Sequence, residues 1–405
     1  MKYPICQAIY NITFHPLAKI PGSKLWSCSR FPFIHSLLRG TIIHDFQALH
    51  EKYGPVLRIG PDEVTFADPD AYQDILQIRA DHQQFLKDPT WWNKQDGQDE
   101  NLITANNPDV HARMRKMLVP AFTVRALRAQ EPIVQRYVNL LIERLSEHTV
   151  KNEDRKGTGS EINISTWMNF TTFDIFGDLG FGESFDCLQQ SRYHPWIALL
   201  FNSVKMAACV AASRYYPLVD SLLMKCIPSS LRKMQEDHFQ QIADKVQRRL
   251  NWELERPDIM SYVINEGSEK KKALPLGEIQ ATFNALTIAG SETTATALTG
   301  TINCLVNDPN KLKLLEEEVR STFRDSGDMS LDALQNLPYL NAVLTEGMRL
   351  CPPIPWVLPR RVPVGGDTVC GVWLPGGVSL TSPHRLYFFP SDILTRPVSQ
   401  FKLTR

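Results

Sequence analysis

The sequence predicts a mainly α-helical protein with small β-sheets, of the α+β class. Apolar residues recur at helical spacing over most of the chain. Short runs rich in β-branched residues and bounded by Gly and Pro occur near both ends, at 56–66 and 357–381. Hydrophobic residues make up 43% and charged residues 22% of the chain, which is ordinary for a globular protein.

Charge and cysteine content exclude several classes of function. The 44 basic and 44 acidic side chains cancel, and no basic run suggests nucleic-acid binding. The eight cysteines form no C-x-x-C pair and no His cluster accompanies them, so we expect no metal site of the zinc type. Scattered reduced thiols suit a reducing compartment. No apolar run reaches 18 residues, so no full transmembrane helix is predicted.

The first part of the chain alternates helices with one hairpin. An apolar stretch at 5–14 and a Pro-containing connector at 15–22 precede a helix predicted for 41–53 and a hairpin of 56–59 with 64–66. Asp68-Pro69 is typical of a helix start, with an N-cap residue and proline at the first position. The polar segment 87–107 is predicted to be a loop, in which Trp91 and its neighbour either line a ligand pocket or anchor the loop.

A basic helix is predicted to begin at Asn107-Pro108. His111, Arg113, Arg115 and Lys116 crowd two turns of it. Such a face is either solvated or a clamp for an anionic group, since guanidinium groups match carboxylates.

The middle and last parts of the chain are predicted to be largely helical. The predicted helices are 132–148, 167–176, 195–212, 229–255, 257–265, one from Asp308-Pro309 and 338–350. The Gly-rich stretch 177–182 is expected to break the second of these. Residues 151–160 are expected to form a charged loop, and short strands are expected at 357–363, 368–373 and 378–381.

The longest helical pattern, 277–306, contains a small and polar notch at 289–294. Glu292 and Thr293 place a carboxylate beside a hydroxyl, and Gly290 lets a large flat group approach the backbone. The alternative is that the Thr hydroxyls bond to the carbonyl four residues back and that the glycine accommodates a neighbouring helix.

Two further signals follow the notch: Glu346-x-x-Arg349, an acid–base pair on one helix face, and the segment Leu358-Pro359-Arg360. In this order, and with the basic helix at 111–116, the pattern resembles the cytochrome P-450 family of haem-thiolate monooxygenases. The sequence, including residues 10–22, is similar to that of fungal members that modify secondary metabolites. The resemblance covers roughly residues 8 to 384.

The resemblance implies roles for individual residues. Thr293 would bond to the oxygen that is activated, and Glu292 would supply protons; Ala289 and Gly290 would border the haem. His111 and Arg115 would bind one haem propionate, and Arg360 the other, with Arg361 as its rival. Glu346 and Arg349 would be structural. The residues that the resemblance places around the substrate, besides Ala289, are Trp91, Phe283, Ile354 and Trp356.

The resemblance also implies partners and a location. These are haem, molecular oxygen, a hydrophobic small-molecule substrate that is hydroxylated or epoxidised, and a flavoprotein reductase. The apolar stretch at 5–14 resembles the remnant of an anchor, which implies the cytosolic face of the endoplasmic reticulum membrane. Without an anchor the chain would be cytosolic or degraded.

One departure from the family pattern concerns the iron ligand. The family holds iron through a Cys in a Phe-x-x-Gly-x-Arg-x-Cys-x-Gly loop, and the 405 residues contain no such loop. We therefore expect residues 23–384 to form one incomplete, C-terminally truncated domain after the segment 1–22, followed by a divergent tail at 385–405. The expected product is inactive as written; the alternative is a helical remnant that binds no haem.

Overall fold

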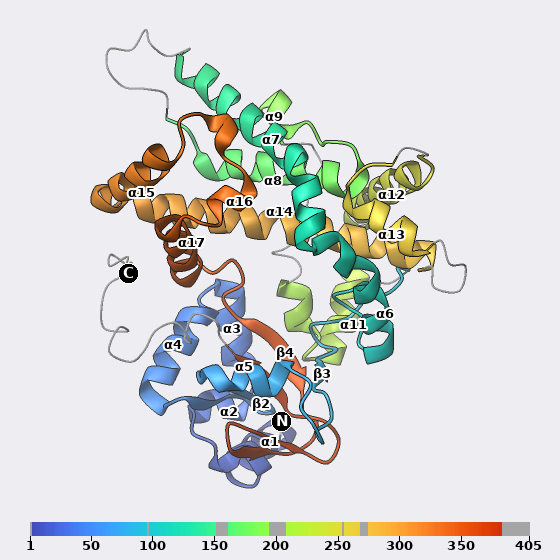
Figure 1. The fold of residues 1–405 in the computed structure, drawn as a ribbon. Coiled ribbons are helices and arrows are strands. Elements are labelled where there is room, and N and C mark those ends of the chain that lie inside the picture. Colours follow the sequence, from blue (N-terminus) through green and yellow to red (C-terminus); the bar gives the residue numbers. More distant parts are fainter. Residues whose placement is uncertain are drawn as a thin grey trace.

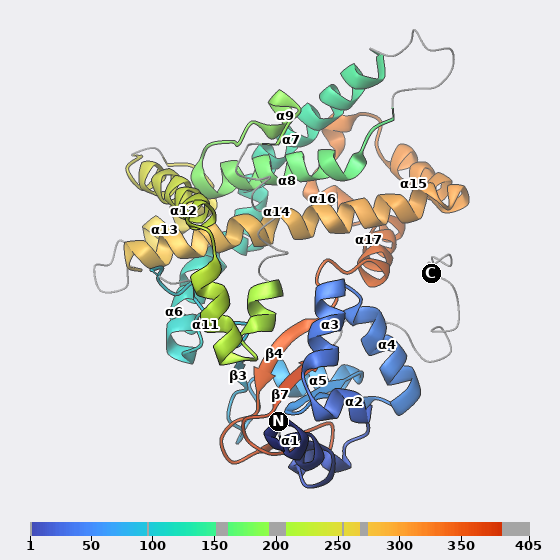
Figure 2. The same cartoon turned by 180° about the vertical axis from the view of Figure 1, so that it is seen from behind.

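A long central helix organises the computed structural model, which describes residues 2–94, 97–150, 161–193, 208–252, 255–267 and 274–382. The predicted loop 151–160, most of the predicted helix 195–212 and the tail 385–405 lie outside these residues. The central helix, α14 (Leu276–Val306), has 31 residues and packs along α8 (Ile164–Phe181). In both views α8 lies on one side of α14, and α17 (Pro338–Leu350) and the strands lie on the other (Figures 1 and 2).

The first third of the chain combines short helices with strands. Its elements are α1 (Lys2–Thr13), η1 (Pro16–Lys19), α2 (Lys24–Cys28), α3 (Phe31–Arg39), α4 (Ile42–Tyr53), β1 (Val56–Gly60), β2 (Glu63–Phe66), α5 (Pro69–Leu76) and β3 (Leu86–Lys87). Asp68 caps α5 by accepting a hydrogen bond from the Asp70 amide. The helix, hairpin and cap predicted for this region are present. No described helix is both long and apolar enough to span a membrane.

The remaining elements are mostly helices. They are α6 (Pro108–Leu118), η2 (Val119–Phe122), α7 (Val124–Val150), α9 (Cys187–Gln190), α11 (Pro217–Cys226), α12 (Ser229–Leu250), α13 (Ile259–Gly267), α15 (Pro309–Thr322), η3 (Ser326–Asp328), α16 (Leu331–Leu334), β4 (Val357–Arg361), β5 (Asp367–Val369), β6 (Val372–Leu374) and β7 (Ser379–Ser382).

Strands from the two ends of the sequence form one sheet. The order is β1-β2-β7-β4-β3, and only the β2–β7 pair is parallel. β5 and β6 form a separate hairpin. The single strand predicted for 368–373 was therefore wrong: Cys370 adopts a φ of 46° and Gly371 one of 74°, so the chain turns there.

Two predictions about helix bounds were wrong. α8 continues through the Gly-rich stretch and ends only at Gly182, which has the left-handed φ of 74° that favours a glycine cap. α7 begins at Val124 rather than at Pro132, which lies inside the helix. The segment that begins at Pro217, for which no element was predicted, forms the helix α11.

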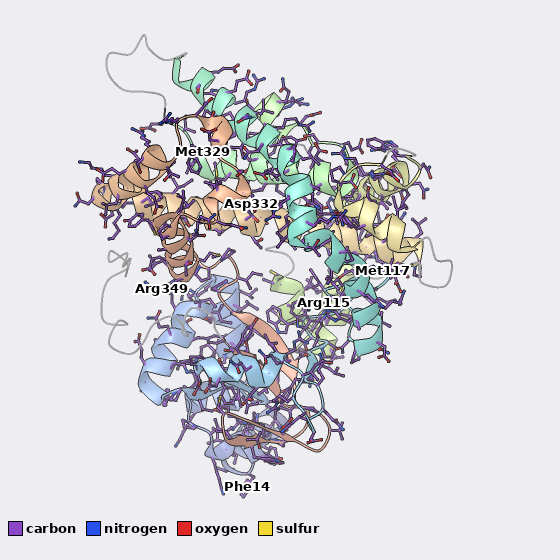
Figure 3. All side chains as sticks on the ribbon, in the orientation of Figure 1. Phe14, Arg115, Met117, Met329, Asp332 and Arg349 are labelled. Atoms are coloured by element: carbon purple, nitrogen blue, oxygen red, sulfur yellow. The ribbon has the colours of Figure 1, made fainter. Side chains whose placement is uncertain are left out.

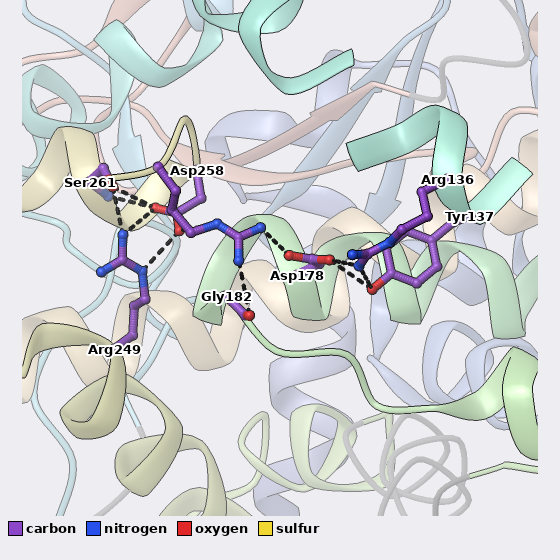
Figure 4. Close-up of polar contacts among 8 residues, drawn as sticks. Arg136, Tyr137, Asp178, Gly182, Arg249, Asp258 and Ser261 are labelled. Atoms are coloured by element: carbon purple, nitrogen blue, oxygen red, sulfur yellow. Dashed lines mark hydrogen bonds and ion pairs between the residues drawn. The ribbon is translucent and has the colours of Figure 1, made fainter. Parts of the chain in front are cut away.

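The helices and the sheet have separate apolar cores. The larger core surrounds α8 and includes Phe173 and Phe283, both at most 1% exposed. A second core lies against the sheet, and a third is formed by aromatic side chains of α3, α4 and the segment before β4. A network of ion pairs lies among the helices α7, α8, α12 and α13 and connects them (Figure 4).

Candidate functional site

The two hydroxyl groups of the α14 notch bond to their own helix. The Thr293 hydroxyl donates to the Ala289 carbonyl, and the Thr294 hydroxyl donates to the Gly290 carbonyl at 2.9 Å. This is the local bonding that Thr often makes within helices. The oxygen of Thr293 can still accept a hydrogen bond, because only its proton is engaged.

Gly290 accommodates α8. A Cβ at this position would lie 3.1 Å from the Phe176 ring of α8, so that ring would have to shift by a few tenths of an ångström to admit a side chain. The residue as a whole is nevertheless exposed. Of the two alternatives for Gly290, helix packing is thus observed directly.

Glu292 is half-buried one residue before Thr293. Burial raises the pKa of its carboxyl group above the usual range, and no nearby cation opposes that shift. Its charge in turn contributes to raising the pKa of Tyr193, an effect that is dominated by the burial of that phenol. Glu292 is therefore positioned to keep a proton longer than an ordinary surface carboxylate.

Four basic side chains converge between α6 and the β3–β4 pair. Burial lowers the pKa of His111, and the charges of Lys87, Arg115 and Arg360 lower it further. Burial likewise lowers the pKa of Lys87 to about 8, with Arg360 adding to the shift and Glu100 opposing it. We call His111, Lys87, Arg115 and Arg360 the cation cluster.

The cation cluster is short of negative charge. Lys87 donates to three backbone carbonyls, those of Leu102, Ile103 and Ala105, at 2.7–3.0 Å. Within the described part of the chain, no ion pair engages His111, Arg115 or Arg360, although burial lowers the pKa of Arg360. Arg115 is exposed, but Arg360 is partly buried, and buried cations usually have anionic partners. The cluster is therefore suited to receive an anion from outside the chain at Arg360.

Arg361, which follows Arg360 in β4, already has a carboxylate partner. Arg361 Nε lies 3.2 Å from a carboxylate oxygen of Asp88, which is 2% exposed. Arg361 also donates to the Gly377 carbonyl at 3.1 Å. Its charge is already matched, which leaves Arg360 as the arginine of β4 without a carboxylate partner among the described residues.

α6 is fixed to the start of α14, since Arg113 Nη2 lies 2.9 Å from Glu278 Oε1. Figure 3 shows Arg115 on α6 and Arg349 near the end of α17, both on the side of α14 that faces the strands. The predicted Glu346–Arg349 pair is formed: Nε and Nη2 of Arg349 donate to the two carboxylate oxygens at 2.6 and 2.7 Å. Glu346 is only 8% exposed, so this ion pair is largely buried and is not an exposed surface pair.

The residues expected around the substrate lie in two separate places. Trp91 and Trp356 contact each other in the aromatic core, with ring centroids 5.1 Å apart. Ile354, two residues before Trp356, is 55% exposed. Phe283 is instead enclosed in the large helical core, where its ring lies 6.0 Å from that of Phe181. Its packing is that of an ordinary core residue.

Sequence reasoning missed Lys87, Arg30 and Tyr215. Trp91 Nε1 donates to the Tyr215 hydroxyl at 2.9 Å, and the Arg30 guanidinium lies 4.5 Å from the centroid of the same ring. Burial raises the pKa of Tyr215. Nothing in the local sequence marks these residues, because their partners are distant in the chain.

The residues present fit the carboxylates of a haem but not its iron. A thiolate is needed at iron, and burial, together with the neighbouring Cys351 and Glu346, raises the pKa of Cys304 to about 11. Burial and three aspartates raise the pKa of Cys370 to about 12. Cys370 lies on the β5–β6 turn rather than near α14.

The fold and the cation cluster point to a class of helical proteins that hold an anionic prosthetic group beside a long helix. Residues 23–381 match the family model described as cytochrome P450. The chain is 39% identical over 385 residues to the cytochrome P450 monooxygenase lcsI of Purpureocillium lilacinum, covering 94% of this chain and 73% of that protein. The chain therefore belongs to the cytochrome P450 family.

Two further relatives carry the names of reactions. The averantin hydroxylase of Dothistroma septosporum is 36% identical over 398 residues, which are 98% of this chain and 73% of the relative. The trichothecene C-15 hydroxylase of Fusarium sporotrichioides is 37% identical over 399 residues, 98% of this chain and 79% of the relative. Family members use haem, oxygen, a hydrophobic substrate and a redox partner. The mainly helical fold with small sheets, predicted from the sequence, is confirmed.

Proposed function

We propose that the chain is the scaffold of a haem monooxygenase that hydroxylates or epoxidises a hydrophobic small molecule in fungal secondary metabolism. The observation that carries the proposal is the cation cluster, whose His111, Arg115 and Arg360 have no anionic partner among the described residues. The hydroxylases among its relatives support the reaction type. When bound, haem would supply the iron that activates oxygen.

The chain's own residues would have three tasks. His111, Arg115 and Arg360 would bind the two carboxylates of the cofactor and so orient it. Thr293 would accept a hydrogen bond at its hydroxyl oxygen, and Glu292 would deliver a proton, for which its raised pKa is suited. Ala289 and Gly290 would border the cofactor, and Glu346 with Arg349 would hold α17 in place.

We also propose that these 405 residues do not complete the iron site and do not catalyse monooxygenation by themselves. The 405 residues contain no Phe-x-x-Gly-x-Arg-x-Cys-x-Gly loop, and Cys370 lies on the β5–β6 turn, which supports this proposal. A helical protein that binds no haem at all is the alternative.

Haem and haem dimethyl ester differ only in their carboxylates and therefore test the clamp. The unaltered protein should bind haem about 10- to 100-fold more tightly than the ester, since each charge-assisted hydrogen bond contributes roughly 1.5–3 kcal/mol. Arg360→Gln should lose most of this preference. Arg361→Gln is the control, and it should keep the preference. Equal binding of haem and ester to the unaltered protein would refute the proposed role of the cluster.

We also propose a redox partner and a location. A flavoprotein reductase would supply electrons, as the family resemblance implies. α1 and the residue that follows it expose Ile5, Ile9 and Phe14 by 54–75%, so they offer an apolar surface to a membrane, here the endoplasmic reticulum. Flotation with phosphatidylcholine vesicles tests this, with Ile5→Ser/Ile9→Ser/Phe14→Ser as the variant that should remain in the soluble fraction.

A further inference from the structure

Two cysteines meet where α14 packs against α17 (Figure 1). Cys304 lies near the end of α14, and Cys351 is the residue directly after α17. Both side chains are partly buried, and both pack against a small apolar core formed by Leu305, Val343 and Leu350. The two thiols are hydrogen-bonded to each other. The fold therefore brings together two sulfur atoms that the sequence places far apart.

Gly300, one turn before Cys304, leaves the space that the Cys351 side chain occupies. A Cβ at position 300 would lie 2.5 Å from the Cys351 Cβ and 3.1 Å from its Sγ. Positions four residues apart share one face of a helix, with Cβ atoms about 5–6 Å apart. Cys351 therefore lies about one helical turn from Cys304, and its thiol reaches along α14 to the other thiol. This placement is compatible with the Cβ spacing of a disulfide, about 3.5–4.5 Å.

The surroundings of the pair make its oxidation slow but possible. Burial raises the pKa of Cys304 to about 11, and the charge and hydrogen bond of Cys351, followed by the charge of Glu346, add to the shift. Thiols react with oxidants as thiolates, so this pair resists weak oxidants near neutral pH. Both side chains are nevertheless partly exposed, which gives a small oxidant access to them.

We propose that Cys304 and Cys351 are a redox modification site, at which hydrogen peroxide forms a reversible disulfide that links α14 to α17. One thiolate attacks the peroxide, the O–O bond breaks, and a sulfenic acid and hydroxide form; the hydroxide takes up the thiol proton and becomes water. The second thiol then attacks the oxidised sulfur, and the S–S bond forms as a second water leaves. Overall, two thiols are oxidised and one peroxide is reduced to two waters. The inference goes beyond the proposed function and does not depend on haem.

Peptide mapping of the full chain without haem tests the proposal. Trypsin should release residues 273–311 and 350–360, which contain Cys304 and Cys351 as their only cysteines. After native protein is treated with hydrogen peroxide, mass spectrometry under non-reducing conditions should show these two peptides joined. Their joined form should be at least about 10-fold more abundant than any other cysteine pair, because the fold gives the two thiols a high effective concentration. Dithiothreitol should separate the peptides again.

Serine variants identify the two partners. Cys304→Ser and Cys351→Ser should each remove the joined peptides. Cys28→Ser is the matched control and should keep them, since Cys28 is also partly buried but its Sγ donates locally to the Leu25 carbonyl at 3.1 Å. Oxidation should raise the Tm of the unaltered protein by about 2–5 °C, as a cross-link between two elements predicts, and should leave that of Cys351→Ser unchanged.

Oxidation of the unaltered protein in urea keeps the test valid even where a serine variant fails to fold. The unfolded chain should give a mixture of cysteine pairs, because the contact between the two thiols depends on the fold. Native protein without the 304–351 link, or an equal yield of this link in native and unfolded protein, would overturn the proposal. A link that forms without any rise in Tm would refute the claim that it fixes α17 to α14.

Discussion

At the scale of single residues, burial without a matching charge shifts several groups toward their neutral forms. It raises the pKa of Glu292 and Cys304 and lowers that of His111. Burial therefore favours the protonated carboxyl group of Glu292 and the protonated thiol of Cys304, both on α14. It also favours the neutral imidazole of His111 beside the cations of the cluster. Each shift can be measured on the folded protein.

Cys304 should be slow to alkylate. With its pKa raised to about 11, the thiolate fraction at pH 8 falls about 100-fold below that of an ordinary cysteine. Iodoacetamide labelling followed by peptide mass spectrometry should show this protection, and labelling should speed up as the pH rises toward 11. Labelling in urea is the control. Equal rates in the native and unfolded protein at pH 8 would show that the thiol is not protected.

Arg360→Gln should raise the pKa of His111, because it removes one of the three cations that lower it. The folded pKa lies below the unfolded value of about 6.5, so unfolding takes up a proton as the pH falls from about 6.5 toward the folded value. This imidazole imposes no penalty above that window and destabilises the fold below it. NMR titration of the imidazole checks the shift; an unchanged or lower pKa in Arg360→Gln contradicts it.

At the scale of elements, the close packing of α17 and α8 against their neighbours depends on glycines. A Cβ on Gly347 of α17 would lie 2.0 Å from Thr301 Oγ1 of α14, closer than any real contact. A Cβ on Gly177 of α8 would lie 2.9 Å from the Glu183 carbonyl oxygen. These glycines allow close approach rather than chain reversal.

Gly347→Ala should therefore destabilise the fold by about 1–3 kcal/mol, the usual cost of overpacking. Gly327→Ala is the matched control, because nothing lies within 4 Å of a Cβ there, and its cost should be small. Urea unfolding of both variants gives the comparison. Equal midpoints for the two variants would show that α14 and α17 are not in such close contact.

Asp258→Asn should cost about 3–5 kcal/mol, as expected when one partner of a buried ion pair is lost. Asp258 is 0% exposed and pairs with Arg249, 1% exposed, at 2.9 Å (Figure 4). Asp332→Asn is the control: its pair with Arg128 is more than half exposed on both sides and should contribute at most about 1 kcal/mol. Similar unfolding free energies for the two variants would contradict the difference in burial.

Sequence patterns located most elements because their signals are local. The cap at Asp68-Pro69 and the periodicity of 277–306 describe contacts within a few residues. The start of α7 was misplaced at Pro132, whereas the Thr123 hydroxyl accepts a hydrogen bond from the Ala126 amide and caps the helix there. The bounds of α8 depended on which glycine adopts a left-handed φ, which tertiary packing decides.

At the scale of the whole molecule, the candidate site depends on contacts that the sequence does not encode locally. Arg361 and Asp88 are 273 positions apart, and their pairing distinguishes Arg361 from Arg360. Trp91 and Tyr215 are 124 positions apart. The family resemblance supplied candidate residues, and their roles remain predictions. The fold brings residues 87–115 and Arg360, which are distant in the sequence, together in the cation cluster on one side of the central helix.

The central claim is that this scaffold binds the carboxylates of haem without offering its iron a thiolate. The most direct test is the visible spectrum of the purified 405-residue protein after titration with haem, reduction and addition of carbon monoxide. We predict a saturable Soret band that weakens in Arg360→Gln and a carbon monoxide complex without thiolate-type absorption. Thiolate-type absorption at one haem per chain would contradict the claim.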